Sequence, residues 1–421
     1  MNQLLCSILL FLSSTACLAY ESLEIDLDSG ITMNVTEFQG EGKTLLLWLP
    51  SERGFGQGYI SVALNLAALD YDLWAVQLHD SYVIPTSRNS LNEVELEDLV
   101  ELIDKAKQQG FEEIFVISSS RGVLLSLKTT YLYQKLNKES DILKGLLIFS
   151  PYLIKGRTEM GQDAEYEEIA SFSNLPVYML QPQYGTKFAR SVEISNQLQN
   201  GGSPVYMHVL RETQAGFYMR PDEDLTERDI ASREQLPQIL DEAVNLLRFS
   251  DAAKLNTHFA ADDANSDVKS RSSRMPRLHP FKGDKTAPSL ALNNLQNQMS
   301  TLKDLEGSVV LVNFWATWCG PCVEEIPSLS RLVEHMEGKP FKVVAVNIGE
   351  SAEDISEFLK SIPVNFDIYL DSDGVAVRDW KVYAYPSNFL LDKNGQIQYA
   401  YRGALKWDAP SIIDTIDSLL E

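Results

Sequence analysis

Two cysteines separated by two residues are the feature of the sequence best suited to chemistry. They lie in the segment Trp318-Cys319-Gly320-Pro321-Cys322, directly after the apolar run 309–315 and at the start of a helical pattern. A thiol at a helix N-terminus faces unpaired backbone N–H groups and the positive end of the helix dipole, which lower its pKa. We therefore expect Cys319 to be the attacking thiolate and Cys322, one turn further in, to resolve the mixed disulfide.

Half of a zinc site is the alternative interpretation of such a pair. Zinc would need further Cys or His ligands, and the histidine nearest in sequence, His335, lies more than three helical turns beyond Cys322. The other two cysteines, Cys6 and Cys17, lie in an N-terminal segment that we expect to be removed. A single close pair then indicates a working dithiol, with no metal and no cofactor beyond the redox-active disulfide itself.

The N-terminal segment, residues 1–19, is typical of a cleavable signal peptide, which predicts a periplasmic or secreted protein. A short apolar core, 4–12, precedes the small-residue site Cys17-Leu18-Ala19, although no Lys or Arg stands before it. Lipidation of Cys17 is the alternative, disfavoured because Ser14 stands where an aliphatic residue is needed. Beyond this segment no apolar stretch approaches the length required to span a bilayer.

The charge excludes one class of partner. Asp and Glu outnumber Lys and Arg by 59 to 36, for a formal net charge of -23. Binding to nucleic acid requires clustered basic residues, so we expect no nucleic-acid partner.

The elements around the cysteines alternate between strands and helices. We expect the following order: strand 309–315, helix from 320 into the 330s, strand 342–348, helix 352–361, strand 366–370, a hairpin of 387–391 with 396–401, and a terminal helix.

Residues 281–421 resemble the TlpA/ResA/DsbE-like branch of the thioredoxin family. The resemblance rests on the segment 313–322 (NFWATWCGPC), on Pro327, and on the segment 385–392 (YPSNFLLD). It implies a thioredoxin-like fold with a cis peptide bond before Pro386. It also implies that Trp318, Tyr385 and Pro386 bind the substrate.

The proton chemistry implied by the resemblance centres on Glu325. Ordinary thioredoxins have a buried aspartate where Asn313 stands, and Asn313 cannot titrate. The TlpA-like branch has instead a glutamate three residues after the second cysteine, the position of Glu325. We expect burial to raise the pKa of Glu325 and to make it the proton relay for Cys322.

The resemblance implies that the protein reduces disulfides in exported protein substrates, and that a membrane thiol carrier of the DsbD/CcdA type then reduces its own disulfide again. A disulfide isomerase or oxidant is the alternative, since the direction depends on the reduction potential. A binding protein with a vestigial redox site is disfavoured because the cysteines, Pro327 and Pro386 are all present together.

The region before residue 250 predicts a second α/β domain with a mostly parallel sheet covered on both faces. The pattern loses its apolar periodicity between about 250 and 285. We therefore divide the chain into a signal peptide (1–19), a first domain (20–250), a linker (251–280) and the thioredoxin-like domain (281–421). In the first domain we expect a hairpin around 28–30, strands at 44–49, 73–78, 113–118, 145–150, 176–180 and 204–210, and helices at 59–69, 91–108 (with Ser90 as N-cap) and 233–248.

The segment 117–123 (ISSSRGV) resembles the nucleophile elbow of α/β-hydrolases, with Ser120 in the place of the nucleophile. The G-x-S-x-G motif is incomplete because Ser118 replaces its first glycine. No carboxylate follows the strand at 176–180 and no histidine follows the strand at 204–210. His79 and His208 do not stand where the base belongs. We therefore expect a degenerate, non-catalytic domain used for binding or docking; a serine hydrolase is the alternative.

Overall fold

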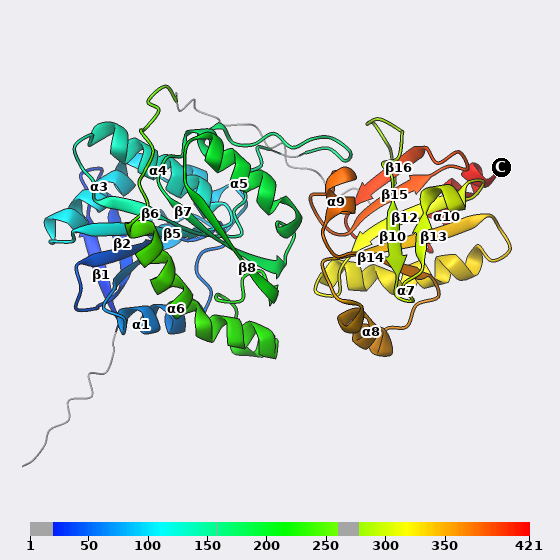
Figure 1. Ribbon diagram of the computed structural model, residues 1–421, viewed down its shortest axis with the longest axis horizontal. Helices are drawn as coiled ribbons and strands as arrows, with labels where there is room; N and C mark the ends of the chain where they lie inside the picture. The colour runs from blue at the N-terminus through cyan, green and yellow to red at the C-terminus, as the bar shows by residue number, and fades with distance from the viewer. Residues whose placement is uncertain (1–19, 157, 260–277) are drawn as a thin grey trace, which may run out of the picture.

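The computed structural model describes residues 20–156, 158–259 and 278–421. Within these residues the chain forms two eight-stranded sheets, one in the N-terminal part and one in the C-terminal part, each flanked by helices (Figure 1). We call the first body the N-terminal unit. The predicted signal peptide lies outside the described residues, as does the middle of the predicted linker, and the domain boundaries stay a prediction.

The first sheet is mostly parallel, as predicted, with the order β1-β2-β4-β3-β5-β6-β7-β8. Only the pairs β1–β2 and β2–β4 are antiparallel; the pairs from β4–β3 through to β7–β8 are parallel. The strands are β1 (Tyr20–Asp26), β2 (Thr32–Phe38), β3 (Thr44–Trp48), β4 (Asp72–Val76), β5 (Glu113–Ser119), β6 (Leu143–Phe149), β7 (Val177–Tyr184) and β8 (Val205–Gln214).

Helices cover both faces of this sheet, which is why its central strands are apolar along their whole length. One face packs against α1 (Tyr59–Ala67) and α6 (Glu227–Arg248), and the other against α3 (Leu96–Gln108), α4 (Gly122–Leu136) and α5 (Ser191–Asn200). Shorter helical turns are α2 (Leu78–Ser81), η1 (Ser90–Glu93), η2 (Glu168–Phe172), η3 (Phe188–Arg190) and η4 (Asp222–Asp224).

Several predicted boundaries in this unit were wrong. The helix predicted at 91–108 is broken: η1 ends at Glu93, and Val94 and Glu95 are extended before α3 begins. Leu91 and Val94, on either side of the end of η1, both lie in the core. Helix α6 begins at Glu227 rather than near 233, because Thr226 and Asp229 form a capping box there. Strands β7 and β8 continue to Tyr184 and Gln214 because they pair with each other beyond the predicted ends.

The second sheet has the order β11-β10-β14-β13-β12-β15-β16-β9. Its central strand, β12, runs parallel to β13 and antiparallel to β15. The strands are β9 (His279–Pro280), β10 (Ala291–Asn294), β11 (Met299–Thr301), β12 (Val309–Trp315), β13 (Phe341–Ile348), β14 (Asp367–Asp371), β15 (Ser387–Leu391) and β16 (Ile397–Arg402).

Helices lie on both faces of the second sheet as well (Figure 1). The core on one face includes residues of α7 (Gly320–His335), α8 (Ala352–Ser361) and α10 (Pro410–Leu420). The core on the other face includes α9 (Val375–Asp379) and Trp380. A further turn, η5 (Leu302–Leu305), precedes β12. None of the helices in the described part of the chain is both long and apolar enough to cross a bilayer.

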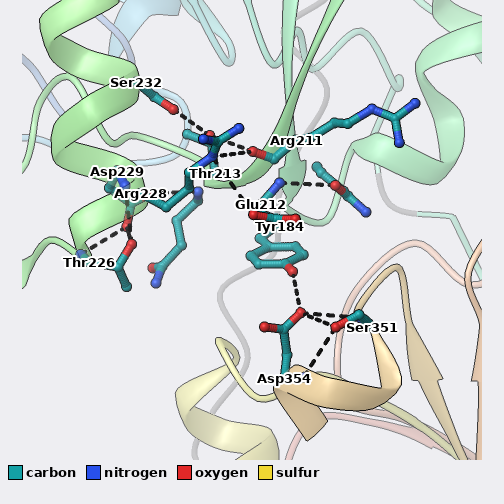
Figure 2. A network of polar contacts seen from close by, with 12 residues as sticks. Tyr184, Arg211, Glu212, Thr213, Thr226, Arg228, Asp229, Ser232, Ser351 and Asp354 are labelled. Carbon is teal, nitrogen blue, oxygen red and sulfur yellow. Dashed lines mark hydrogen bonds and ion pairs between the residues drawn. The ribbon is translucent and has the colours of Figure 1, made fainter.

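Hydrogen bonds join the two bodies. Tyr184, at the end of β7, donates to the carboxylate of Asp354 at 2.9 Å, and Asp354 lies in the first turn of α8 (Figure 2). Gln183 donates to the carbonyl of Gly349 at 2.6 Å. Arg190 donates to the carbonyl of Val377 at 3.3 Å. The end of the first sheet that carries β7 and β8 therefore contacts α8 and α9 of the C-terminal body.

Candidate active site

Cys319 and Cys322 form a disulfide at the start of α7, with their Cα atoms 5.2 Å apart. Cys319 is the N-cap residue, and its carbonyl accepts from the backbone N–H groups of Cys322 and Val323. Its sulfur is thus attached where the helix presents unpaired N–H groups. Cys319 is 8% exposed and Cys322 fully buried, so the order of exposure matches the predicted order of attack.

The carboxylate of Glu325 lies one turn further along α7, buried in a cage of donors. One oxygen accepts from the Asn313 amide at 2.7 Å. The other accepts from the Leu405 backbone N–H at 3.1 Å and from the Trp407 indole N–H at 3.2 Å. The Asn313 amide also donates to the side-chain oxygen of Asn388 at 2.7 Å, which orients it. Asn313 therefore positions the carboxylate although it cannot titrate itself.

Burial raises the pKa of Glu325 to about 7. The hydrogen bonds from Leu405, Asn313 and Trp407 act in the opposite direction, because each stabilises the charged form. Loss of hydration outweighs them since the side chain is only 3% exposed. A carboxyl group with this pKa can both take and give a proton near neutral pH.

The residues predicted to bind the substrate lie beside the cysteines. The Tyr385–Pro386 peptide bond is cis, the conformation predicted for it. The Tyr385 ring packs edge-on against the ring of Trp318, with 5.9 Å between their centroids. Trp318 directly precedes Cys319, so the structure brings Trp318, Tyr385 and the disulfide together.

Comparisons with known proteins agree with this geometry. Residues 284–400 match the AhpC/TSA family. The chain is 34% identical over 119 residues to the thiol-disulfide oxidoreductase ResA of Bacillus subtilis and 36% identical over 122 residues to the thioredoxin-like protein YneN of the same organism. The chain belongs to the thioredoxin-like thiol-disulfide oxidoreductases. Each match covers 28% of this chain, which spans 66% of ResA and 71% of YneN.

A solved structure assigned as the thiol:disulfide interchange protein DsbE of Chlorobium tepidum is 32% identical. The similarity covers 34% of this chain and 100% of that one, with a TM-score of 0.31. After the matches to ResA and YneN, the C-terminal body is called the thioredoxin-like domain below.

A second buried carboxylate in the thioredoxin-like domain was not predicted from the sequence. Glu350, 2% exposed, accepts from the Thr317 backbone N–H at 2.8 Å, from the Thr317 hydroxyl, and from the Asn347 amide at 2.7 Å. Burial raises its pKa. Because Thr317 stands two residues before Cys319, Glu350 fixes the backbone that leads into the thiol. In the sequence, the only indication of this buried carboxylate was the position of an acidic residue just after the apolar strand β13.

No cluster of three or more His, Cys, Asp or Glu side chains suited to hold a metal ion occurs within the described ranges 20–156, 158–259 and 278–421.

Ser120 lies in the sharp turn between β5 and α4, with φ +50°. A Cβ atom on Gly122 would lie 2.2 Å from the carbonyl oxygen of Pro50, so the turn requires glycine there. The carboxylate of Glu52 accepts from the Ser120 hydroxyl at 3.3 Å and from the Arg121 N–H at 3.2 Å. Ser120 thus faces a carboxylate and not an imidazole.

The two histidines of the N-terminal unit considered as bases lie in other contacts. His208 bonds to the Tyr178 hydroxyl at 2.8 Å. His79 contacts the backbone carbonyl of Glu52 and the hydroxyl of Ser90. Among the described residues, neither imidazole forms a hydrogen bond with Ser120.

Proposed function

We propose that the protein is an exported thiol-disulfide oxidoreductase that reduces disulfides in protein substrates. One observation carries the proposal: the Cys319–Cys322 disulfide at the start of α7 has the buried carboxyl group of Glu325 one turn behind it. A dithiol and a group that titrates near neutral pH are together sufficient for disulfide exchange. The disulfide itself is the redox group, and no other cofactor is needed.

In the proposed reaction the Cys319 thiolate attacks one sulfur of the substrate disulfide and expels the other as a thiolate. Cys322 then gives its proton to Glu325 and attacks Cys319, which releases the second substrate sulfur as a thiolate. Both released thiolates take up protons, one of them from Glu325. Two electrons pass to the substrate, and the protein is left with the Cys319–Cys322 disulfide.

The remaining parts of this proposal concern partners and location. Trp318, Tyr385 and Pro386 bind the substrate segment that carries the disulfide; the contact between the Trp318 and Tyr385 rings, next to Cys319 in sequence, supports this. The predicted signal peptide supports a periplasmic or secreted location. A membrane thiol carrier of the DsbD/CcdA type would then supply the electrons that return the protein to its dithiol form.

For the N-terminal unit we propose a degenerate α/β-hydrolase that binds rather than catalyses. The strand–turn–helix position of Ser120, its positive φ and the glycine requirement at Gly122 support the family. The Glu52 carboxylate argues against catalysis, because it accepts the hydrogen bond that the Ser120 hydroxyl would donate to the imidazole of a catalytic base. Serine-dependent ester hydrolysis by the full chain, lost in Ser120→Ala, would contradict this part of the proposal.

The redox function is tested with a disulfide-bridged peptide whose fluorescence rises on reduction. Cys319→Ala should lose all activity, because no attacking thiolate is left. Cys322→Ala should stop after one step and remain bonded to the peptide as a mixed disulfide, visible by mass spectrometry. Ser356→Ala, on the exposed surface of α8, is the matched control and should react like the unaltered protein.

Retained turnover in Cys319→Ala would refute the mechanism. A reduction potential near or above about -120 mV would replace the reductase with the oxidant alternative.

A further inference from the structure

A cavity of about 700 Å³ lies between the N-terminal unit and the thioredoxin-like domain. The N-terminal unit contributes most of its wall, including Glu52, Arg121 and Lys187, and the thioredoxin-like domain contributes Tyr383, Ala384 and Arg402. We call it the interdomain cavity. It is large enough for several residues of an extended peptide and open to solvent.

The charged side chains of the interdomain cavity are almost all positive. Among the described residues, Glu52 is the single acidic side chain in its wall, against five basic ones: Arg53, Arg88, Arg121, Lys187 and Arg402. The chain as a whole has a net charge of -23, so this concentration of positive charge runs against its composition. A concave surface of one sign focuses the electrostatic field and attracts ligands of the other sign.

Three of these cations gather around the ring of Tyr152. The Arg121 guanidinium lies 4.0 Å from the ring centroid, the Lys187 ammonium 5.7 Å and the Arg88 guanidinium 5.9 Å. Among the residues that the structure describes, none of the three has a carboxylate oxygen within salt-bridge distance. Like charges held this closely repel one another, and a bound anion would relieve the repulsion.

The electrostatic environment of the cations agrees with this geometry. Burial lowers the pKa of Arg121, and the nearby charge of Arg88 lowers it further. Burial also lowers the pKa of Lys187, with Arg53 and Arg121 acting in the same direction against Glu52. The Glu52 carboxylate acts in the opposite direction on both groups, and its oxygens also accept from Ser120 and from the Arg121 backbone N–H.

The interdomain cavity shares a chain segment with the residues predicted to bind the substrate. Tyr383 and Ala384, in its wall, directly precede Tyr385 and Pro386. The Tyr385 ring in turn contacts Trp318, the residue before Cys319. A polypeptide whose cysteine lies at Cys319 can thus place its neighbouring residues along the segment 383–386 and into the cavity.

We propose that the interdomain cavity binds a carboxylate-bearing segment next to the cysteine that Cys319 attacks, so that the N-terminal unit selects acidic disulfide substrates. This inference rests on the proposed redox function and adds a substrate class to it. The cation cluster around Tyr152 supplies the charge, and the shared wall at Tyr383 and Ala384 supplies the connection to the thiol.

The test measures how efficiently the reduced full-length protein reduces each of two fluorogenic disulfide peptides. They differ only in the residues that flank the cysteines, which are aspartates in one peptide and asparagines in the other. We expect kcat/KM for the aspartate peptide to be about tenfold higher in about 0.02 M salt. The preference should shrink to within about twofold in about 0.5 M salt, because salt screens the attraction.

Two substitutions and a matched control assign the preference to the interdomain cavity. Arg121→Gln and Lys187→Gln should each lower the ratio between the two peptides by about threefold, because each removes one positive charge from the site. Lys43→Gln removes the same charge just before β3, at the opposite end of the strand from Glu52, where Lys43 is exposed and paired with Glu112. This control should keep the full ratio. Circular dichroism would verify that each variant is folded.

The possible results separate this inference from the proposed function. A preference for the aspartate peptide that Arg121→Gln and Lys187→Gln both weaken would support the inference. Equal reduction of the two peptides, or a preference that only Lys43→Gln weakens, would overturn it and leave the redox function intact. Failure to reduce either peptide would overturn both.

Discussion

Opposing effects meet at the Glu325 carboxyl group, where three hydrogen-bond donors favour the charge and burial opposes it. Burial prevails, so the folded protein holds the proton up to a pH of about 7, whereas a glutamate in the unfolded chain loses it near its ordinary pKa of 4.5. As the pH rises between these values the unfolded chain releases its proton first. This favours unfolding, so Glu325 makes the folded protein less stable as the pH rises through that window.

We therefore expect Glu325→Gln to flatten the dependence of stability on pH. Relative to the variant, the unaltered protein should lose on the order of 3 kcal/mol of unfolding free energy between pH 4.5 and 7. Urea unfolding of the disulfide form at several pH values measures this difference. Glu324→Gln, at the exposed neighbouring position, is the control and should retain the unaltered protein's profile. An identical pH profile in Glu325→Gln would show that Glu325 does not titrate in this range.

The sequence could point to Cys319, Cys322 and Glu325 because their spacing within one helix is local information. The cage around Glu325 could not be predicted in the same way. Asn388 stands 75 residues from Asn313, and Trp407 stands 82 residues from Glu325. Such contacts depend on how β12, β15 and the chain before α10 pack together, which no local pattern encodes.

At the level of elements, the stability of helix α6 depends on the contacts made at its N-terminus. The Thr226 hydroxyl accepts from the Asp229 N–H at 3.1 Å, and the Asp229 carboxylate accepts from Thr226 in return (Figure 2). The same carboxylate accepts from the Gln214 N–H at the end of β8, at 2.7 Å. Asp229 is fully buried, so it ties the helix to the sheet as well as capping it.

Two substitutions should separate these roles of the α6 N-terminus. Thr226→Ala should cost about 1 kcal/mol of unfolding free energy, the usual effect of losing an N-cap. Asp229→Ala should cost about 2–3 kcal/mol, because it also leaves the partly buried Gln214 N–H without its acceptor. Chemical denaturation measures both effects. Thr415→Ala on α10 removes only a hydroxyl bonded within its own helix and should be nearly neutral. Equal losses for Thr226→Ala and Asp229→Ala would contradict the second role.

Elements were predictable where their pattern was long and apolar. The sequence predicts β12 with its observed ends because every residue of that strand is buried. It failed at 91–108, where the chain is extended at Val94 and Glu95 between η1 and α3. It also missed α4 and α5, which are 15 and 10 residues long. The missed elements β10, β11 and α9 are three to five residues long, too short for a periodicity to develop.

At the level of the whole molecule, the contacts between the two bodies could not be predicted from the sequence, because they join positions far apart in the chain. Arg190 is the most buried of the charged groups that make them. Its side chain is 7% exposed, pairs with Glu193, and lies 4.4 Å from the Tyr383 ring centroid. It donates to the carbonyls of Val377 and Arg378 at 3.3 and 3.4 Å. A single side chain of the N-terminal unit thus bonds to two backbone carbonyls at the end of α9.

We expect Arg190→Ala to uncouple the two bodies. The substitution removes the donor of three hydrogen bonds, although Glu193 keeps the Tyr166 hydroxyl as a donor and both carbonyls keep backbone N–H donors. Losing hydrogen bonds made by a charged group costs about 1.5–3 kcal/mol. The melting transitions of the two bodies, measured by scanning calorimetry, should therefore move apart by roughly 5 °C or more. Arg331→Ala, which breaks a half-exposed ion pair with Asp408 inside the thioredoxin-like domain, is the control and should leave their separation unchanged. If Arg190→Ala melted with the same separation as the unaltered protein, these contacts would not couple the bodies, and the interdomain cavity would lack the fixed walls that its proposed selectivity requires.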